Sequence, residues 1–223
     1  RHLSADKRAK VARRMVTDWT LETSPVVSFS YGCEEFHFRF NGANKYQERA
    51  WLDGKFWEAE ELDYLTAVIP SRPAVIDVGA NIGTFTRLLL SKVGTNGMVV
   101  AVEPESRNIK NLQQSFSKEL ESGQLKIFDC AVTDKKGDCF LHVDPCNPGG
   151  HTLASIGIPI KGITIDQIVS DVGLIPTFIK IDVEGYEGNV IYGAKGTLNK
   201  FHPVIFTEFN PLLMSHCGNN AHK

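Results

Sequence analysis

The sequence predicts an α/β fold in which helices cover both faces of a mostly parallel β-sheet. From Ala74 onward, short apolar and β-branched runs alternate with helical segments, which is the pattern of a parallel sheet with helical crossovers. The run over residues 98–102 is apolar throughout, as expected of a strand that is buried on both faces. Several runs end at an acidic residue, and ligands of such sheets bind beyond the carboxyl ends of the strands.

Residues 1–70 are expected to lead into the main domain, which occupies residues 71–223. Apolar side chains recur every fourth residue along the first helix, whereas Phe36, Phe38 and Phe40 alternate with polar residues as in a half-buried hairpin. The lead-in is predicted to contain a helix over 5–19, strands over 26–31 and 36–40, and a helix over 57–69.

The main domain is predicted to continue this alternation, interrupted by an irregular loop rich in Pro and Gly over residues 144–151. Residues 210–223 are too few for another complete βα unit. Predicted strands begin at Ala74 and span 98–102, 125–128, 140–143, 177–183 and 204–209; predicted helices span 85–93, 106–120 and 166–172 and pass through 190–191.

The composition is that of an ordinary globular protein, and it excludes some classes of partner. The chain of 223 residues has a formal net charge of -2, so no basic surface for nucleic acid or an anionic membrane is expected. No apolar run approaches the roughly 18–20 residues that a membrane-spanning helix needs. The chain begins at Arg1 rather than Met, which suggests that an upstream segment is missing.

The five cysteines are odd in number and scattered along the chain. This usage favours free thiols in a reducing compartment, and hence a cytoplasmic protein, over a disulfide framework. Cys139, His142, Cys146 and His151 lie close together in the sequence, but their spacing matches no standard zinc site. No bound metal is therefore expected.

A strand, a glycine-containing loop and a helix follow one another around Asp77, Gly79, Asn81 and Gly83. This is the layout of a dinucleotide-binding turn, but the three-glycine spacing and the P-loop lysine are both absent. An acid two residues before the first glycine would repel a pyrophosphate and would suit a cationic amine. The alternative is a simple turn in which glycine supplies backbone freedom.

Acidic residues gather at the predicted carboxyl ends of the strands. So many carboxylates at one edge would repel one another, which leaves three explanations: a cationic ligand, a divalent metal, or capping of the following helices. Capping is expected to explain only one or two of them. The six acids are Asp77, Glu103, Asp129, Asp182, Glu184 and Glu208.

Glu103, at the end of the second strand of the main domain, can accept hydrogen bonds from both hydroxyls of an adenosine ribose. A ligand with a ribose diol, an ammonium group and no phosphate meets the demands of this edge, and S-adenosylmethionine is such a ligand. The residues expected to bind it are Asp77, Gly79, Asn81, Gly83, Glu103, Asp129, Ala131 and Asp182.

Taken together, these motifs resemble those of the FkbM family of S-adenosylmethionine-dependent methyltransferases. The resemblance covers residues 36–210 and depends most on the block over residues 179–187, which reads Ile-Lys-Ile-Asp-Val-Glu-Gly-Tyr-Glu, together with the loop over residues 77–83 and the acid Glu208. It implies a Rossmann-like methyltransferase fold and methylation of hydroxyl oxygens on sugars, polysaccharides or polyketide-type natural products. It also implies a small-molecule or glycan acceptor.

Methyl transfer to a hydroxyl requires a base, because a neutral alcohol is a poor nucleophile. Glu184 is expected on the same side of its strand as Asp182, although it could instead cap the next helix. His151 lies in the Pro/Gly loop, and histidine is the residue type whose ordinary pKa is nearest neutrality, although His151 could equally be a solvated loop residue. Glu208 is the third candidate, and a metal-bound acceptor remains an alternative.

Two other functions remain open at this point. The final helix and antiparallel strand pair that are usual in the wider methyltransferase fold are expected to be missing after Asn210. A non-catalytic domain that keeps the fold and binds a partner or a ligand is therefore one alternative. An NAD-dependent oxidoreductase is disfavoured because the three-glycine fingerprint is absent. The oligomeric state is not predicted.

Overall fold

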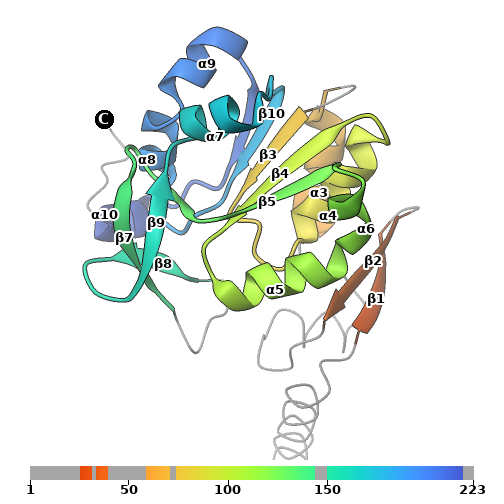
Figure 1. Cartoon of the computed structure of the whole chain (residues 1–223), viewed down its shortest axis with the longest axis horizontal. Coiled ribbons are helices and arrows are strands. Elements are labelled where there is room, and N and C mark those ends of the chain that lie inside the picture. The colour runs from red at the N-terminus through yellow and green to blue at the C-terminus, as the bar shows by residue number, and fades with distance from the viewer. Residues whose placement is uncertain (1–25, 32–33, 40–58, 71–73, 144–149, 218–223) are drawn as a thin grey trace, which may run out of the picture.

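The computed structural model describes residues 26–31, 34–39, 59–70, 74–143 and 150–217. The helix expected over 5–19 and most of the Pro/Gly loop lie outside these residues. Within the part of the chain that the structure describes, the α/β prediction is confirmed. A Rossmann-like parallel sheet lies between two layers of helices (Figure 1).

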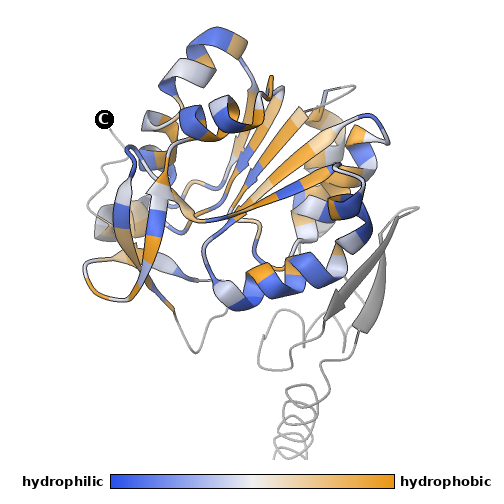
Figure 2. Ribbon diagram, in the orientation of Figure 1, coloured by the Kyte–Doolittle hydropathy of each residue, from blue (hydrophilic) through white to orange (hydrophobic). Residues whose placement is uncertain are grey.

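The central sheet has five strands, all parallel, in the order β11-β10-β3-β4-β5. Each strand is formed by a mostly apolar run of the sequence, and the strands are therefore coloured largely as hydrophobic in Figure 2. The strands are β3 (Ala74–Val78), β4 (Met98–Glu103), β5 (Leu125–Asp129), β10 (Phe178–Ile181) and β11 (Val204–Thr207).

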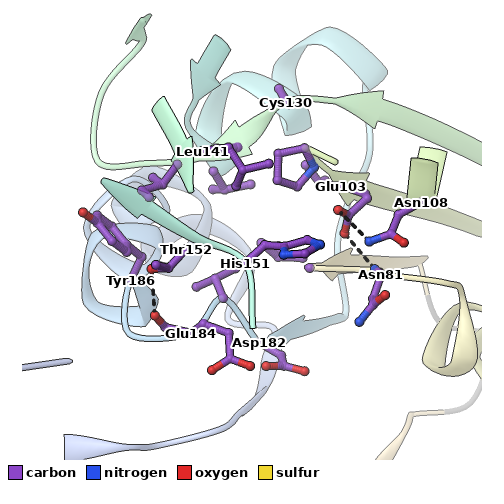
Figure 3. Close-up of a pocket in the computed structure, with 18 residues that line it drawn as sticks. Asn81, Glu103, Asn108, Cys130, Leu141, His151, Thr152, Asp182, Glu184 and Tyr186 are labelled. Carbon is purple, nitrogen blue, oxygen red and sulfur yellow. Dashed lines mark hydrogen bonds between the residues drawn. The ribbon is translucent and has the colours of Figure 1, made fainter. Parts of the chain in front are cut away.

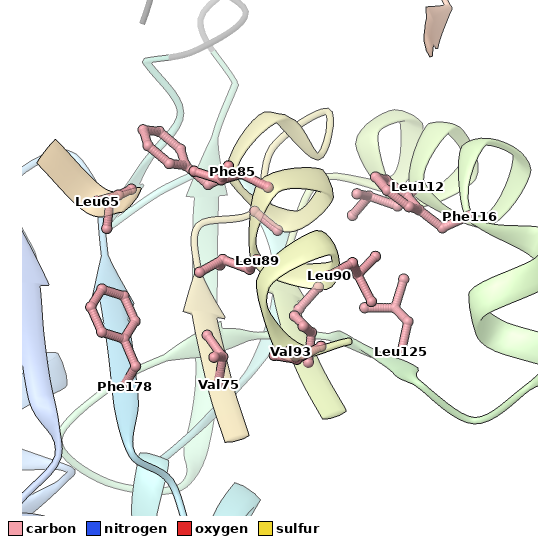
Figure 4. Packing of buried hydrophobic residues seen from close by; sticks show 14 of the residues in the cluster. Leu65, Val75, Phe85, Leu89, Leu90, Val93, Leu112, Phe116, Leu125 and Phe178 are labelled. Carbon is pink, nitrogen blue, oxygen red and sulfur yellow. The ribbon is translucent and has the colours of Figure 1, made fainter. Parts of the chain in front are cut away.

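One layer of helices packs on the first face of this sheet and encloses a core of leucine and phenylalanine (Figure 4). Leu65, Leu89 and Phe178 are fully buried there. The layer consists of α3 (Ala59–Val68), α4 (Thr84–Val93), α5 (Ser106–Ser115) and α6 (Ser117–Glu121).

The opposite face is covered by three helices that pack on Ile76, Val100 and Ile179. Along β3, β4 and β10, alternate residues enter the two cores, so apolar side chains are needed on both faces. This layer consists of α7 (Ile165–Val172), α8 (Glu187–Tyr192) and α9 (Lys195–Phe201).

A second sheet of four strands, ordered β6-β9-β7-β8, lies between β5 and α7 in the sequence. Of these four strands, the sequence predicted only part of β7. Strand β9 was not predicted because it contains Pro159 and Gly162, which are typical of loops. Both residues are nevertheless paired with β7, Pro159 with Phe140 and Gly162 with Gly137. The strands are β6 (Ala131–Val132), β7 (Gly137–His142), β8 (Thr152–Ala154) and β9 (Ile158–Ile163).

One predicted helix is divided in the structure, and two further helices were not predicted. The helix expected over 106–120 is divided into α5 and α6 at Phe116, whose φ of -122° is not helical. Helix α9 was not expected around Gly196, and α10 (Pro211–His216) was not expected after β11. Among the described residues after β11, the structure shows this helix and no strand.

The predicted hairpin of the lead-in is confirmed as an antiparallel pair, in which Val26 pairs with Arg39 and Tyr31 with Glu34. Its strands are β1 (Val26–Tyr31) and β2 (Glu34–Arg39). Strand β2 lies beside α4 and α5.

Candidate functional site

A pocket lies at the carboxyl ends of β3, β4 and β10, where the central sheet meets the second sheet. Figure 3 shows its lining side chains. The lining comprises Val78, Gly79, Asn81, Val102, Glu103, Pro104, Asn108, Cys130, Ala131, Val132, Leu141, His151, Thr152, Leu153, Asp182, Val183, Glu184 and Tyr186. This is the edge at which the sequence predicted a ligand.

Gly79 forms the tight turn between β3 and α4 and has a φ of +75°. Its amide and that of Ala80 both donate to the carbonyl oxygen of Val102, so the turn is anchored to β4. A Cβ atom at Gly79 would overlap the main-chain carbonyl of Asp182. Glycine is therefore required here because two backbone segments approach closely.

Gly83 lies outside the pocket lining, at the N-cap of α4, with a φ of +95°. A Cβ atom there would collide with the side chains of Leu112 and Phe116. The glycine thus allows α4 to pack closely against α5. Asn81, between the two glycines, adopts the positive φ expected for it, +51°.

Glu103 is almost fully buried at the end of β4. Its Oε2 accepts a hydrogen bond from the amide of Asn81 at 2.8 Å, and its Oε1 accepts one from the amide of Glu105 at 2.9 Å. The side-chain amide of Asn108 donates to Oε1 at 3.3 Å. Burial raises the pKa of Glu103 to about 7, although these hydrogen bonds act in the opposite direction.

Asp77 does not line the pocket but lies beneath the loop, with no solvent exposure. Its Oδ2 accepts a hydrogen bond from the hydroxyl of Thr86 at 2.6 Å. Its Oδ1 forms an ion pair with Lys180, the residue paired with it on β10, at 3.3 Å.

Lys180 is itself only 2% exposed and connects the two loops of the site. Its Nζ donates to the carbonyl of Gly79 at 2.8 Å and lies 3.5 Å from Oδ2 of Asp182. The ammonium also lies 5.0 Å from the centre of the Phe85 ring. A single buried cation therefore fixes the β3–α4 turn relative to the segment that follows β10.

Asp182 and Glu184 line the pocket with their carboxylates on the same side of the chain (Figure 3). The sequence predicted this arrangement from the alternation of side chains along a strand, and that reason is wrong. Strand β10 ends at Ile181, and Glu184 adopts a left-handed φ of +51°. Glu184 does not cap α8 either, since that helix begins without a side-chain cap.

The carboxylates around Glu184 influence its titration. Desolvation, followed by the charges of Asp182, Glu208 and Glu187, raises the pKa of Glu184 to about 7. Partial desolvation and the nearby carboxylate of Asp182 also raise the pKa of Glu208. A carboxyl group with a pKa near 7 is suited to proton transfer at neutral pH.

The structure places the remaining expected residues as follows. His151 and Ala131 line the pocket, whereas Asp129 and Glu208 do not. Asp129 is exposed and is paired with Glu103 across β4 and β5. Of the eleven residues expected in the site, seven share the pocket: Gly79, Asn81, Glu103, Ala131, His151, Asp182 and Glu184.

Several site residues were not anticipated from the sequence. Asn108 and Thr152 reach the site through hydrogen bonds to Glu103 and to the carbonyl of Glu184, and no local pattern reveals such contacts. Lys180 is different, because the sequence alone marks it as unusual. A lysine within an apolar strand that is buried on both faces must have a charged partner nearby.

Within the described ranges, no group of three or more His, Cys, Asp or Glu side chains is arranged to hold a metal ion. Cys146, one of the four residues considered for zinc, lies outside those ranges. None of the described helices is long and apolar enough to span a membrane.

Comparison with known proteins gives one family match. The family model described as the methyltransferase FkbM domain matches residues 77–217. A search of curated proteins gives no match.

Several solved structures are similar over part of their length. The methyltransferase FkbM from Methylobacillus flagellatus KT is 18% identical, with 89% of this chain and 49% of that chain covered and a TM-score of 0.48. The tRNA (uracil-54, C5)-methyltransferase of Pyrococcus abyssi, in complex with S-adenosyl-L-homocysteine, is 10% identical, with 86% and 37% covered and a TM-score of 0.47. Precorrin-6y C5,15-methyltransferase from Geobacter metallireducens GS-15 is 12% identical, with 74% and 68% covered and a TM-score of 0.44. The chain thus spans about half the length of the first of these proteins, 49%.

Proposed function

Because this chain belongs to the FkbM family of methyltransferases, we propose that it transfers a methyl group to a hydroxyl oxygen of a sugar, polysaccharide or polyketide-type natural product. S-adenosylmethionine is the cofactor, and it supplies a methyl group already activated on a sulfonium. The observation that carries the proposal is the buried Glu103 carboxylate, which lines a pocket at the end of β4 and is held by main-chain amides.

The residues of the pocket fit this cofactor. Glu103 can accept hydrogen bonds from ribose hydroxyls, and Oδ1 of Asn81 is a buried acceptor with no partner within the described structure. Asp182 offers a carboxylate to a cationic group, and the Gly79 turn leaves its main chain accessible to a ligand. Ala131 adds part of the apolar wall.

Three other residues expected to bind the cofactor have indirect roles in this proposal. Asp77 acts through Lys180 and Thr86, which together hold the Gly79 turn in place. Gly83 allows α4 to begin next to α5. Asp129 lies at the exposed end of β5, next to Glu103.

Glu184 is the proposed base that accepts the proton of the acceptor hydroxyl. Its pKa of about 7 suits a group that takes up a proton at neutral pH, and Glu184 lines the pocket together with Asp182. His151 lines the same pocket and is the second candidate. Glu208 is the third, because it lies close enough to Glu184 to affect its titration.

The charges of the pocket favour an uncharged acceptor. Three lining residues are carboxylates, Glu103, Asp182 and Glu184, and none of the described lining residues is Lys or Arg. Lys180 is nearby, but its ammonium is held by Asp77 and Asp182. A phosphate or carboxylate on the acceptor would therefore be repelled, by about 2 kcal/mol for one unit charge at roughly 8 Å.

We therefore expect neutral glycosides and polyols to be methylated with a kcat/KM at least about tenfold higher than that of their phosphorylated counterparts. Mass spectrometry of matched pairs, with detection of the gain of one methylene unit, measures this ratio. Equal rates within the pairs would contradict the charge argument, whereas no methylated product from any hydroxyl compound would contradict O-methylation itself.

Replacement of Glu103 by alanine is expected to weaken S-adenosylhomocysteine binding by about 1.5–3 kcal/mol, the range for hydrogen bonds to a charged group. Isothermal titration calorimetry measures the change, with NAD titrated in parallel to test the oxidoreductase alternative. The exposed Glu121→Ala variant is the control for a loss of negative charge. Unchanged affinity in Glu103→Ala would remove the ribose assignment, and tight binding of NAD would favour the oxidoreductase.

A further inference from the structure

The segment between β10 and α8 has an unusual backbone conformation. Glu184 and Gly185 both have positive φ angles, +51° and +100°. The left-handed region is unfavourable for a residue with a side chain, such as Glu184, so neighbouring contacts must hold it there. These contacts determine where the Glu184 carboxylate points.

Glu187, the first residue of α8, supplies two of these contacts. Its Oε1 accepts hydrogen bonds from the amides of Val183 at 3.3 Å and Gly185 at 3.0 Å, on either side of Glu184. The side chain of Glu187 is buried, with the residue only 4% exposed. One carboxylate oxygen thus holds the backbone before and after the strained residue.

The carbonyl of Glu184 is held from two other elements. The hydroxyl of Thr152 on β8 donates to it at 3.1 Å, and the thiol of Cys217, after α10, donates to it at 3.7 Å. Gly185 has no room for a side chain, because a Cβ atom would meet Leu213 and Cys217. Thr152, Cys217 and Glu187 therefore all hold the backbone of this segment in place.

We propose that Glu187 is a positioning residue for the methyl transfer, because its buried carboxylate holds the backbone of Val183 and Gly185 so that Glu184 faces the pocket. This inference depends on the function proposed above. Glu187 does not line the pocket, so it acts through Glu184 and not on the acceptor.

The charge of Glu187 adds a second effect. Asp182, Glu208 and Glu187 all raise the pKa of Glu184, while Lys180 is held by Asp77 and Asp182. The other titratable groups that line the pocket are Glu103, Cys130, His151 and Tyr186, and the Cys217 thiol contacts the main chain. Removal of the Glu187 charge should make the ionised form of Glu184 more stable and lower its pKa.

Two substitutions separate the hydrogen bonds of Glu187 from its charge. Glu187→Gln keeps an oxygen that can accept from both amides and removes only the charge, whereas Glu187→Ala removes both. Glu121→Gln, at an exposed position on α6, is the matched control for the loss of a distant charge. Calorimetry with S-adenosylhomocysteine and circular dichroism establish that each variant is folded and binds the cofactor product.

Carbon-13 NMR of protein labelled at glutamate carboxyl carbons gives a readout that needs no acceptor. The Glu184 signal is assigned by its absence in Glu184→Gln. In Glu187→Gln, its titration midpoint is expected to fall by about 0.5–1 pH unit relative to the wild type, while Glu121→Gln leaves it unchanged. A purely structural role for Glu187 would not move this midpoint in the isosteric variant.

With the acceptor identified by the product screen, Glu187→Ala is expected to lower kcat about 10–100-fold, with the KM for S-adenosylmethionine within twofold of wild type. Glu187→Gln should recover most of that rate. Normal binding of S-adenosylhomocysteine together with a wild-type kcat in Glu187→Ala would overturn the positioning role alone. An unchanged Glu184 midpoint in Glu187→Gln would overturn the charge effect. Absence of S-adenosylhomocysteine binding in the wild type would instead overturn the proposed function, and this inference with it.

Discussion

Glu184→Gln is expected to lower the rate of methyl transfer about 10²–10⁴-fold while S-adenosylhomocysteine affinity changes by less than about twofold. Glutamine has nearly the same shape but cannot accept the proton of the acceptor hydroxyl. The backbone contacts that fix residue 184 come from Glu187, Thr152 and Cys217, and the substitution leaves them in place. Single-turnover measurements, combined with calorimetry, separate the chemical step from binding.

The pH dependence of the wild-type rate follows from the same assignment. A base must be ionised, so the rate should be low below the Glu184 pKa of about 7 and rise through it as the pH increases. An ordinary histidine has a pKa near 6.5, so a rise of the rate with pH in this range does not by itself distinguish Glu184 from His151. The variants distinguish them, because the rise of the rate with pH should persist in His151→Ala if Glu184 is the base.

Full activity of Glu184→Gln would contradict this assignment. Loss of the rise of the rate with pH in His151→Ala, together with an active Glu184→Gln, would identify His151 as the base. Activity in both variants would leave Glu208 as the remaining side chain among the three candidates, and Glu208→Gln then becomes the deciding variant.

Gly79→Ala is expected to reduce S-adenosylhomocysteine affinity by at least about 100-fold, and Gly79→Val more strongly. The added Cβ would overlap the carbonyl of Asp182, in addition to the cost of about 1–2 kcal/mol for a φ of +75°. Relief of the overlap must move the turn away from Asp182, and this would disturb the bond between Lys180 and the Gly79 carbonyl. Calorimetry measures the loss.

Gly123→Ala is the matched control for this variant. Its φ of +78° is nearly the same, but a Cβ atom there would meet nothing within 4 Å. Both alanine variants therefore share the backbone cost, and only Gly79→Ala has the collision. Equal, small effects of the two substitutions would show that the close approach at Asp182 does not matter for binding.

The sequence predicted the central sheet because its signals are local. Apolar runs such as that of β4 and the glycine turn after β3 act within a few residues, and the FkbM resemblance based on such motifs is confirmed by the family model. Helix α10 was equally readable, since Asn210 is a helix N-cap and Pro211 occupies the first turn.

The elements that escaped prediction depend on contacts between distant residues. Helix α9 contains Gly196, but the amides of Gly196 and Thr197 donate to the carboxylate of Asp166 on α7, which stabilises the first turn. Asp77 was expected to contact the ligand, yet its partner is Lys180 on a neighbouring strand. The sequence of one strand does not show which residue of the neighbouring strand lies beside a given residue in the sheet.

The first and last strands of the second sheet, β6 and β9, lie next to each other. Ala131 on β6 pairs with Gly162 on β9, and the amide of Thr133 donates to the carbonyl of Ile163 at 2.8 Å. Residues 134–161, which include the pocket residues Leu141 and Leu153, therefore begin and end at one fixed junction. A segment whose ends are held together in this way can be exchanged or lengthened with only a small additional cost in loop-closure entropy. Such an exchange would change the pocket wall at Leu141 and Leu153, together with His151 and Thr152, whereas the hydrogen bonds that hold Glu103 and the Gly79 turn lie outside this segment.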